Sequence, residues 1–138
     1  MHEFFDHTGD IGVRIRAADP AGLFEAAAAA MTDAMTSATV EPRHTDEIAL
    51  EASCLDLLLV DWLSELLYRF ETRAFLLARA HVDLEVTAGW HHLRARIEGE
   101  PFEADRHTLK VLVKGVTYHA LEVRQDADGW TATVIFDI

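Results

Sequence analysis

The fold is decided first by residues 11–20, Ile-Gly-Val-Arg-Ile-Arg-Ala-Ala-Asp-Pro. The first seven of these residues alternate between apolar and polar or small side chains, which is the period of a β-strand with one buried face. Asp19 and Pro20 then predict the start of a helix, because aspartate is a good N-cap and proline suits the first helical position. Apolar residues at helical spacing give this helix a buried stripe. The stripe consists of Leu23, Phe24, Ala27, Ala28, Met31 and Met35.

A second strand and a second helix are predicted after a loop over residues 36–42. Residues 47–52 alternate in the manner of a strand. Ser53, followed three residues later by Asp56, matches the capping-box pattern at the start of a helix that is expected to run to about Glu71. Apolar residues cover more than one narrow face of this helix, so we expect it to be largely buried. They are Leu55, Leu58, Leu59, Trp62, Leu63, Leu66, Leu67 and Phe70.

The second half of the chain reads as a run of strands. Alternation over residues 82–86 predicts a third strand, and Ala88-Gly89 turns it into a strand over residues 90–97. Gly99-Glu100-Pro101 is expected to break the chain. Alternation resumes over residues 109–114 and continues through residues 118–123.

The last strand is the most regular one. Asp128-Gly129 signals a hairpin turn, after which Trp130, Ala132, Val134 and Phe136 are expected to point inward and Asp137 to the opposite face. Strand, helix, strand, helix and then several strands predict an α+β fold. We expect one domain over residues 1–138, with two main helices packed on a largely antiparallel β-sheet system.

Composition limits the classes of protein that fit. The chain has 138 residues, half of them hydrophobic, which suits one domain with a substantial core. It shows no apolar run long enough to span a bilayer and no signal-peptide pattern at its start. Cys54 is the single cysteine, so no disulfide within the chain is possible. These features predict a cytoplasmic protein without a membrane partner.

The formal net charge is −12, from 24 acidic and 12 basic residues. Nucleic-acid binding depends on Lys and Arg that neutralise phosphates. The sequence has only two lysines, Lys110 and Lys114, and its ten arginines are scattered. Tight direct binding of RNA or DNA is therefore disfavoured. An acidic surface suits a basic protein partner, a cation, or solubility alone.

The candidates for catalytic chemistry are few. We find no cysteine pair for zinc, no glycine-rich phosphate loop and no nucleophile elbow. His107 and His119 can each be read as an interaction residue or as a structural histidine. The roles of both, and of Lys114, stay open at this point.

The two ends of the chain carry carboxylates that could form a cation site. Asp10 follows His7-Thr8-Gly9, and Asp137 is followed by Ile138 and its terminal carboxylate. If Asp10 meets Asp137 and Ile138 in the fold, the oxygens repel one another unless a cation sits among them or their pKa values rise. Such oxygens suit Ca²⁺ or Mg²⁺, and His7 is the one softer ligand nearby. The alternative is that the two aspartates are solvated strand-end residues that never meet.

Four motifs in order along the chain resemble those of the archease family, over essentially its whole length. The resemblance departs from the family pattern mildly, at Ser64, where asparagine is frequent, and at Gly115, where alanine is usual. Neither departure touches the acidic pair. The matching stretches are residues 7–12, residues 59–68, residues 99–102 with 107 and 113–119, and residues 129–130 with 134–138.

The resemblance implies a non-enzymatic activator of the RNA ligase that joins tRNA halves during tRNA splicing. It implies that the protein promotes guanylylation of the ligase and supports multiple turnover. It also implies that Asp10, Asp137 and Ile138 bind a divalent metal cation. Some archease relatives act more broadly, as chaperones or modulators of RNA-modifying enzymes.

Two further classes remain open. The same carboxylates could serve a metal-dependent phosphohydrolase, although no phosphate-binding arginine cluster is evident near the motif in the sequence. The chain could instead be a small interaction module whose acidic ends bind nothing.

Overall fold

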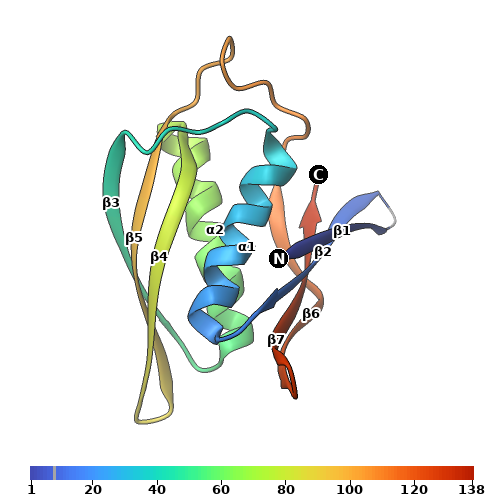
Figure 1. The fold of residues 1–138 in the computed structure, drawn as a ribbon, viewed down its shortest axis with the longest axis vertical. Coiled ribbons are helices and arrows are strands. Elements are labelled where there is room, and N and C mark those ends of the chain that lie inside the picture. The colour runs from blue at the N-terminus through green and yellow to red at the C-terminus, as the bar shows by residue number, and fades with distance from the viewer. Residues whose placement is uncertain (8) are drawn as a thin grey trace.

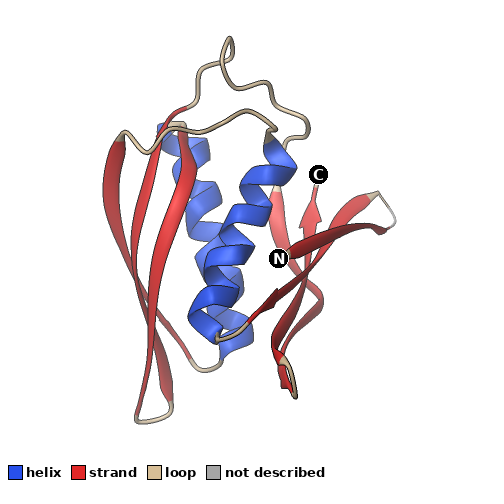
Figure 2. Cartoon of the chain, in the orientation of Figure 1, coloured by secondary structure: helices blue, strands red, loops and turns tan. Residues whose placement is uncertain are grey.

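The computed structural model describes residues 1–7 and 9–138, with the side chain of His7 excepted. These residues form two helices and seven strands. The helices lie side by side between two antiparallel sheets, so that the molecule has three layers (Figure 1). Figure 2 shows the same layers by secondary structure, with long connections crossing one end of the helices. The expected α+β architecture is confirmed.

The sheet that contains both ends of the chain, here called the terminal sheet, has the strand order β1-β2-β7-β6. Its inner face packs on the helices through alternate residues of β7, and Ala132, Val134 and Phe136 are almost completely buried as predicted. The hairpin between β6 and β7 is also confirmed, although its two turn residues are Ala127 and Asp128. The strands are β1 (His2–His7), β2 (Asp10–Ala17), β6 (Gly115–Asp126) and β7 (Gly129–Asp137).

The second sheet, here called the central sheet because its strands come from the middle of the chain, has the order β3-β5-β4. The expected break at residues 99–101 is wrong, because β5 continues through Pro101. Gly99 pairs with His44 of β3 and Pro101 pairs with Phe75 of β4, so both neighbouring strands hold this end in the sheet. Proline is tolerated there because it is the last residue of the strand. The strands are β3 (His44–Ala52), β4 (Phe75–Thr87) and β5 (Trp90–Pro101).

Helix α1 (Pro20–Met35) begins where the sequence predicts. The carboxylate of Asp19 accepts a hydrogen bond of 2.7 Å from the backbone N–H of Gly22 and so satisfies one of the free donors at the helix start. The alanines of its apolar stripe are buried, which lets the helix approach strand β4 closely. The Glu25 carboxylate accepts a 2.8 Å hydrogen bond from the backbone N–H of Val82, at an edge of the central sheet.

Helix α2 (Leu55–Arg73) begins one residue later than the capping box predicts. The N-cap is Cys54, which makes no side-chain cap hydrogen bond, so the assignment of Ser53 as the cap is wrong. The strand ends at Ala52 as predicted, and two residues, Ser53 and Cys54, form the turn before the helix begins. The helix is nevertheless buried as expected. Its Trp62 indole N–H donates to the carbonyl of Phe24 across 3.0 Å and ties the two helices together.

The segment over residues 102–114, here called the bridging segment, joins the central sheet to the terminal sheet across one end of the helices (Figure 1). The strand predicted over residues 109–114 is wrong. Leu109 forms only an isolated bridge with Thr36, and the N–H of Lys110 donates to the carbonyl of Met35 across 2.7 Å. Apolar and polar residues alternate there, but the segment lies against the end of helix α1. A helix end offers no strand edge with which a longer β-ladder could form.

Candidate metal centre

The strand register brings the two aspartates of the predicted site together. Ile11 of β2 pairs with Phe136 of β7 in an antiparallel ladder. Asp10 precedes Ile11 and Asp137 follows Phe136, so each of the two residues lies one residue beyond the last pair of this ladder. Opposed residues of antiparallel strands have Cβ atoms roughly 5 Å apart. The sequence alone left open whether the two ends of the chain meet.

Both aspartates lie on the outer face of the terminal sheet, away from the helices. Side chains alternate along a strand, so Asp10 shares a face with Gly12 and Arg14, and Asp137 shares a face with Ile135. Gly12 pairs with Ile135, which makes this the same face of the sheet. Asp10 is half-buried and Asp137 is exposed.

Contacts with strand β6 and the residue before it hold the main chain around Asp137. Gly115 pairs with Asp137, and the N–H of Lys114 donates to the Asp137 carbonyl across 2.7 Å. Ile138 is partly buried and packs against the core. The backbone that leads to the oxygens of Ile138 is therefore held by a strand on each side and by an apolar anchor.

The donors of this candidate set are all oxygen atoms, two carboxylates and the main-chain oxygens of Ile138. Hard cations such as Ca²⁺ and Mg²⁺ prefer such ligands. Within the described part of the chain, no group of three or more His, Cys, Asp or Glu side chains could hold a metal ion. His7 pairs with Asp10 in the β1–β2 ladder, but its side chain and Thr8 lie outside the described residues. Cation binding by Asp10, Asp137 and Ile138 stays a prediction.

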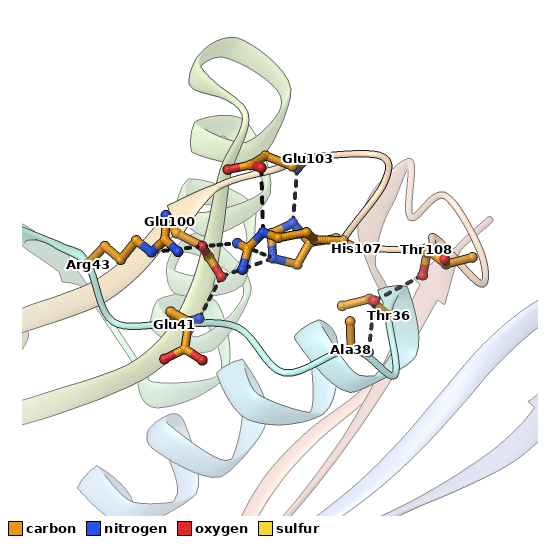
Figure 3. A network of polar contacts seen from close by, with 9 residues as sticks. Thr36, Ala38, Glu41, Arg43, Glu100, Glu103, His107 and Thr108 are labelled. Carbon is orange, nitrogen blue, oxygen red and sulfur yellow. Dashed lines mark hydrogen bonds and ion pairs between the residues drawn. The ribbon is translucent and has the colours of Figure 1, made fainter.

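A buried polar network holds the bridging segment that leads to Lys114 (Figure 3). Glu100, at the end of β5, and His107, in the bridging segment, are both completely buried. His107 Nε2 lies 3.0 Å from Glu100 Oε2, and His107 Nδ1 accepts the backbone N–H of Glu103 across 2.9 Å. Since Nδ1 accepts, the proton resides on Nε2, and the imidazole donates to the carboxylate.

The carboxylate of Glu100 has partners from two further directions. Its Oε2 atom accepts the backbone N–H of Glu41 across 2.7 Å, and the guanidinium of Arg106 binds Oε1 directly. The Arg43 Nε atom lies 3.5 Å from Oε1. The Glu41 backbone hydrogen bond, with His107 and Arg106, lowers the pKa of Glu100 to about 2 against the opposing effect of burial. A buried carboxylate is thus kept ionised by hydrogen bonds from two loops.

This network identifies His107 as a structural histidine, one of the two interpretations that the sequence allowed. Sequence reasoning gave Glu100 no role beyond its place in a predicted chain break and in one of the motifs that resemble the archease family. A glutamate between glycine and proline, seven residues before a histidine, was the available signal. Lys114 and His119 have exposed side chains, and their roles are not decided by their surroundings.

Comparison with known proteins agrees with the geometry of both sheets. The model of the archease protein family matches residues 2–138. This chain belongs to the archease family. Its relatives include the protein archease of Methanopyrus kandleri, which is 36% identical over 138 residues, covering 99% of this chain and 98% of the relative. The protein archease of Methanosarcina barkeri is 35% identical over 140 residues, covering 100% and 96% of the two chains.

A solved archease-like structure has the same fold. The solution structure of protein 1598 from Methanobacterium thermoautotrophicum superposes with a TM-score of 0.82 at 29% sequence identity, covering 99% of this chain and 98% of that one. This archease therefore shares the arrangement of two helices between two antiparallel sheets. Neither helix in the described part of the chain is long and apolar enough to cross a membrane.

Proposed function

We propose that this archease is a non-enzymatic activator of the tRNA-splicing RNA ligase and that it holds a divalent cation between Asp10, Asp137 and the oxygens of Ile138. The observation that carries the proposal is the β2–β7 register, which pairs Ile11 with Phe136 and so supports a site between Asp10 and Asp137, the residues next to that pair. Membership of the archease family supports the choice of partner.

The proposed centre has ligands for a cation, and the neighbouring positions of β2 and β7 on the same face carry no catalytic group. The strand positions next to the aspartates carry Gly12 and Ile135, which offer neither a nucleophile nor a general base. Such a centre suits assistance to another enzyme better than a reaction of its own. When bound, the cation would supply positive charge that favours nucleotidyl transfer in the ligase. Strands β2 and β7 would position the carboxylates of Asp10 and Asp137 at an exposed end of the terminal sheet.

The bridging segment has a supporting role in this proposal. Its first half is anchored by Glu100 and His107, and its last residue binds the Asp137 main chain. A displaced segment would remove the hydrogen bond from Lys114 to Asp137. The buried network therefore supports the direction in which strand β7 presents Asp137.

The test is a guanylylation assay of the purified ligase with GTP and a divalent cation, with and without this protein. Substoichiometric amounts of the protein should raise the rate of guanylylation and allow repeated rounds of RNA joining. Asp10→Asn and Asp137→Asn should lose this effect, and Asp83→Asn, on the exposed face of β4, should keep it. An unchanged rate at equimolar wild-type protein would contradict the proposal.

The same assay separates the alternatives. Release of phosphate from GTP by the protein without ligase, lost in Asp10→Asn, would favour a metal-dependent phosphohydrolase. Protection of a heat-stressed ligase without any change in the guanylylation rate would favour a general chaperone of RNA-modifying enzymes.

We further propose that the protein does not bind RNA tightly by itself. The net charge of −12 repels phosphates at long range. A gel-shift titration with tRNA halves in the absence of ligase should show no complex at submicromolar protein. A tight complex that weakens steeply with salt would contradict this expectation.

A further inference from the structure

The outer face of the terminal sheet has a hollow of about 270 Å³ at the end away from Asp10 and Asp137. Its lining includes three arginines and two threonines, a concentration of positive charge that stands out in so acidic a chain. We call it the arginine hollow. These five residues are Arg14 and Arg16 of β2, Arg124 of β6, and Thr131 and Thr133 of β7.

The register explains why the arginines converge. Thr131 of β7 pairs with Arg16 on one side and with Arg124 on the other. Thr133, two residues along on the same face, pairs with Arg14. Strands lie about 4.8 Å apart, so two long guanidinium side chains flank a short hydroxyl side chain and can reach over it.

Arg14 is held in place without the help of a carboxylate. Its guanidinium carbon lies 4.3 Å from the centre of the Phe5 ring, in a cation–π contact. The ring occupies this position because it covers Gly12, where a Cβ atom would lie only 2.2 Å from the Phe5 ring. Glu3 is opposite Arg14 in the β1–β2 ladder, but among the described residues Arg14 makes no ion pair, so its hydrogen-bond donors are available to a ligand.

Arg124 and Arg16 have partners, but these partners do not use all of their hydrogen-bond donors. The Arg124 Nε atom donates to Thr131 Oγ1 across 3.3 Å and lies 3.2 Å from Glu122 Oε1. Its two terminal nitrogens have no such contacts within the described residues. One terminal nitrogen of Arg16 lies 3.4 Å from Asp126. Exposed ion pairs of this kind are weak and give way to a more highly charged anion.

We propose that the arginine hollow binds a phosphate group of a small phosphorylated molecule. Planar guanidinium forks match phosphate oxygens in a bidentate manner, and the threonine hydroxyls can donate between them. Glu3 and Glu122 also line the hollow. With the net charge of −12, these acids disfavour a long polyanion such as RNA and leave a compact phosphate ligand as the better fit.

The proposal goes beyond the proposed ligase activation and does not depend on it. Arg14 lies four residues from Asp10 along β2, which is roughly 13 Å of strand. The hollow is thus a separate site on the same face as the candidate metal centre. Loss of the arginines should leave cation binding unchanged, so failure of one proposal is distinguishable from failure of the other.

Arg94 and Arg96 provide a matched control on the outer face of the central sheet. They are also two residues apart on one strand, but β3 and β4 place Glu47, His81 and Asp83 beside them in the register. Arg96 also lies 4.0 Å from Glu98. Carboxylates lie beside the arginines at both places, but on the central sheet no threonine pairs with an arginine on each side.

The test is an NMR titration of the 138-residue protein with pyrophosphate, in the presence of a metal chelator. We expect saturable shifts of the Thr131 and Thr133 amide signals. Binding should weaken at least about tenfold in the triple variant R14Q/R16Q/R124Q, since charge-assisted hydrogen bonds are lost. The double variant R94Q/R96Q should bind as the wild type does. Circular dichroism checks folding, and the single variant R14Q serves if the triple variant unfolds.

Further arms of the titration use inorganic phosphate, ADP and a ten-nucleotide single-stranded RNA. Tighter binding of ADP than of phosphate, with the same signals shifted, would identify the ligand as a nucleotide; tighter phosphate binding would identify the free anion. Absence of saturable shifts with all three compact ligands, or equal affinity in the wild type and the arginine variants, would overturn the proposal. Binding of RNA through these arginines without binding of pyrophosphate would also overturn it and indicate a nucleic-acid surface.

Discussion

The imidazole of His107 donates to the carboxylate of Glu100 across 3.0 Å, and both side chains are completely buried. The pair joins the end of a central-sheet strand to the bridging segment. Glu100 is also held by the backbone N–H of Glu41, from a loop 59 residues away in sequence. The end of β5, the bridging segment that follows it and a loop distant in sequence are therefore fixed to one ionised carboxylate.

We expect His107→Leu to lower the free energy of unfolding by about 1–3 kcal/mol, because the Glu103 N–H loses its side-chain acceptor and Glu100 Oε2 keeps only the Glu41 N–H as a donor. Urea unfolding followed by circular dichroism measures the change. His81→Leu, at an exposed position of β4, is the control and should change stability by less than about 0.5 kcal/mol. Equal midpoints for His107→Leu and the wild type would contradict the assigned role of the network.

The depressed pKa of Glu100 makes its contribution depend on pH. Its pKa is about 2 in the folded protein, against an ordinary glutamate pKa of 4.5. A depressed carboxylate pKa stabilises the folded state above the unfolded pKa, and this stabilisation is lost as pH falls through the folded pKa. The stability difference between the wild type and Glu100→Gln should therefore be constant above about pH 5.5 and shrink as pH falls toward 2.

Urea midpoints at several pH values between 7 and 2.5 measure this difference. Glu85→Gln, at an exposed position of β4, provides the comparison for the general effect of removing a negative charge. A difference between the wild type and Glu100→Gln that stays constant over this whole range would show that Glu100 is not held ionised by its neighbours.

Gly12 should be intolerant of a side chain, because a Cβ atom there would meet the Phe5 ring at 2.2 Å. We expect Gly12→Ala to displace the ring and to separate it from Arg14, with a loss of stability of about 1–3 kcal/mol. The double variant Phe5→Ala with Gly12→Ala should lose less than the sum of the two single changes, since the clash is then absent. Urea unfolding of the four proteins gives the coupling. Strict additivity would show that the ring does not cover this glycine.

Local signals in the sequence predicted much of the fold. Asp19 and Pro20 place the start of helix α1 correctly because capping depends on residues three apart. Alternation predicts strand β2 because one of its faces packs on the helices. Ser53 failed as a cap because two residues separate the end of strand β3 at Ala52 from the first residue of the helix, and the capping pattern does not report the length of that turn.

The candidate site depended on contacts that are distant in sequence. The carboxylates of Asp10 and Asp137 could be proposed as ligands from their chemistry, but only the β2–β7 register places them next to one residue pair. Glu100 was missed because its partners include Glu41 and Arg43, which belong to another loop. The arginine hollow was missed because Arg124 joins Arg14 and Arg16 only through the intervening strand β7.

The central claim is that Asp10 and Asp137 jointly hold a divalent cation, and calorimetric titration with Ca²⁺, Mg²⁺ and Mn²⁺ tests it most directly. The wild-type protein should bind at least one of these cations saturably. Asp10→Asn and Asp137→Asn should each weaken this binding at least about tenfold, because each removes a charged oxygen ligand. Both variants should unfold at no lower urea concentration than the cation-free wild type, since two opposed carboxylates repel each other. Asp83→Asn should bind as the wild type does. Unchanged cation affinity in both Asp10→Asn and Asp137→Asn would contradict the claim.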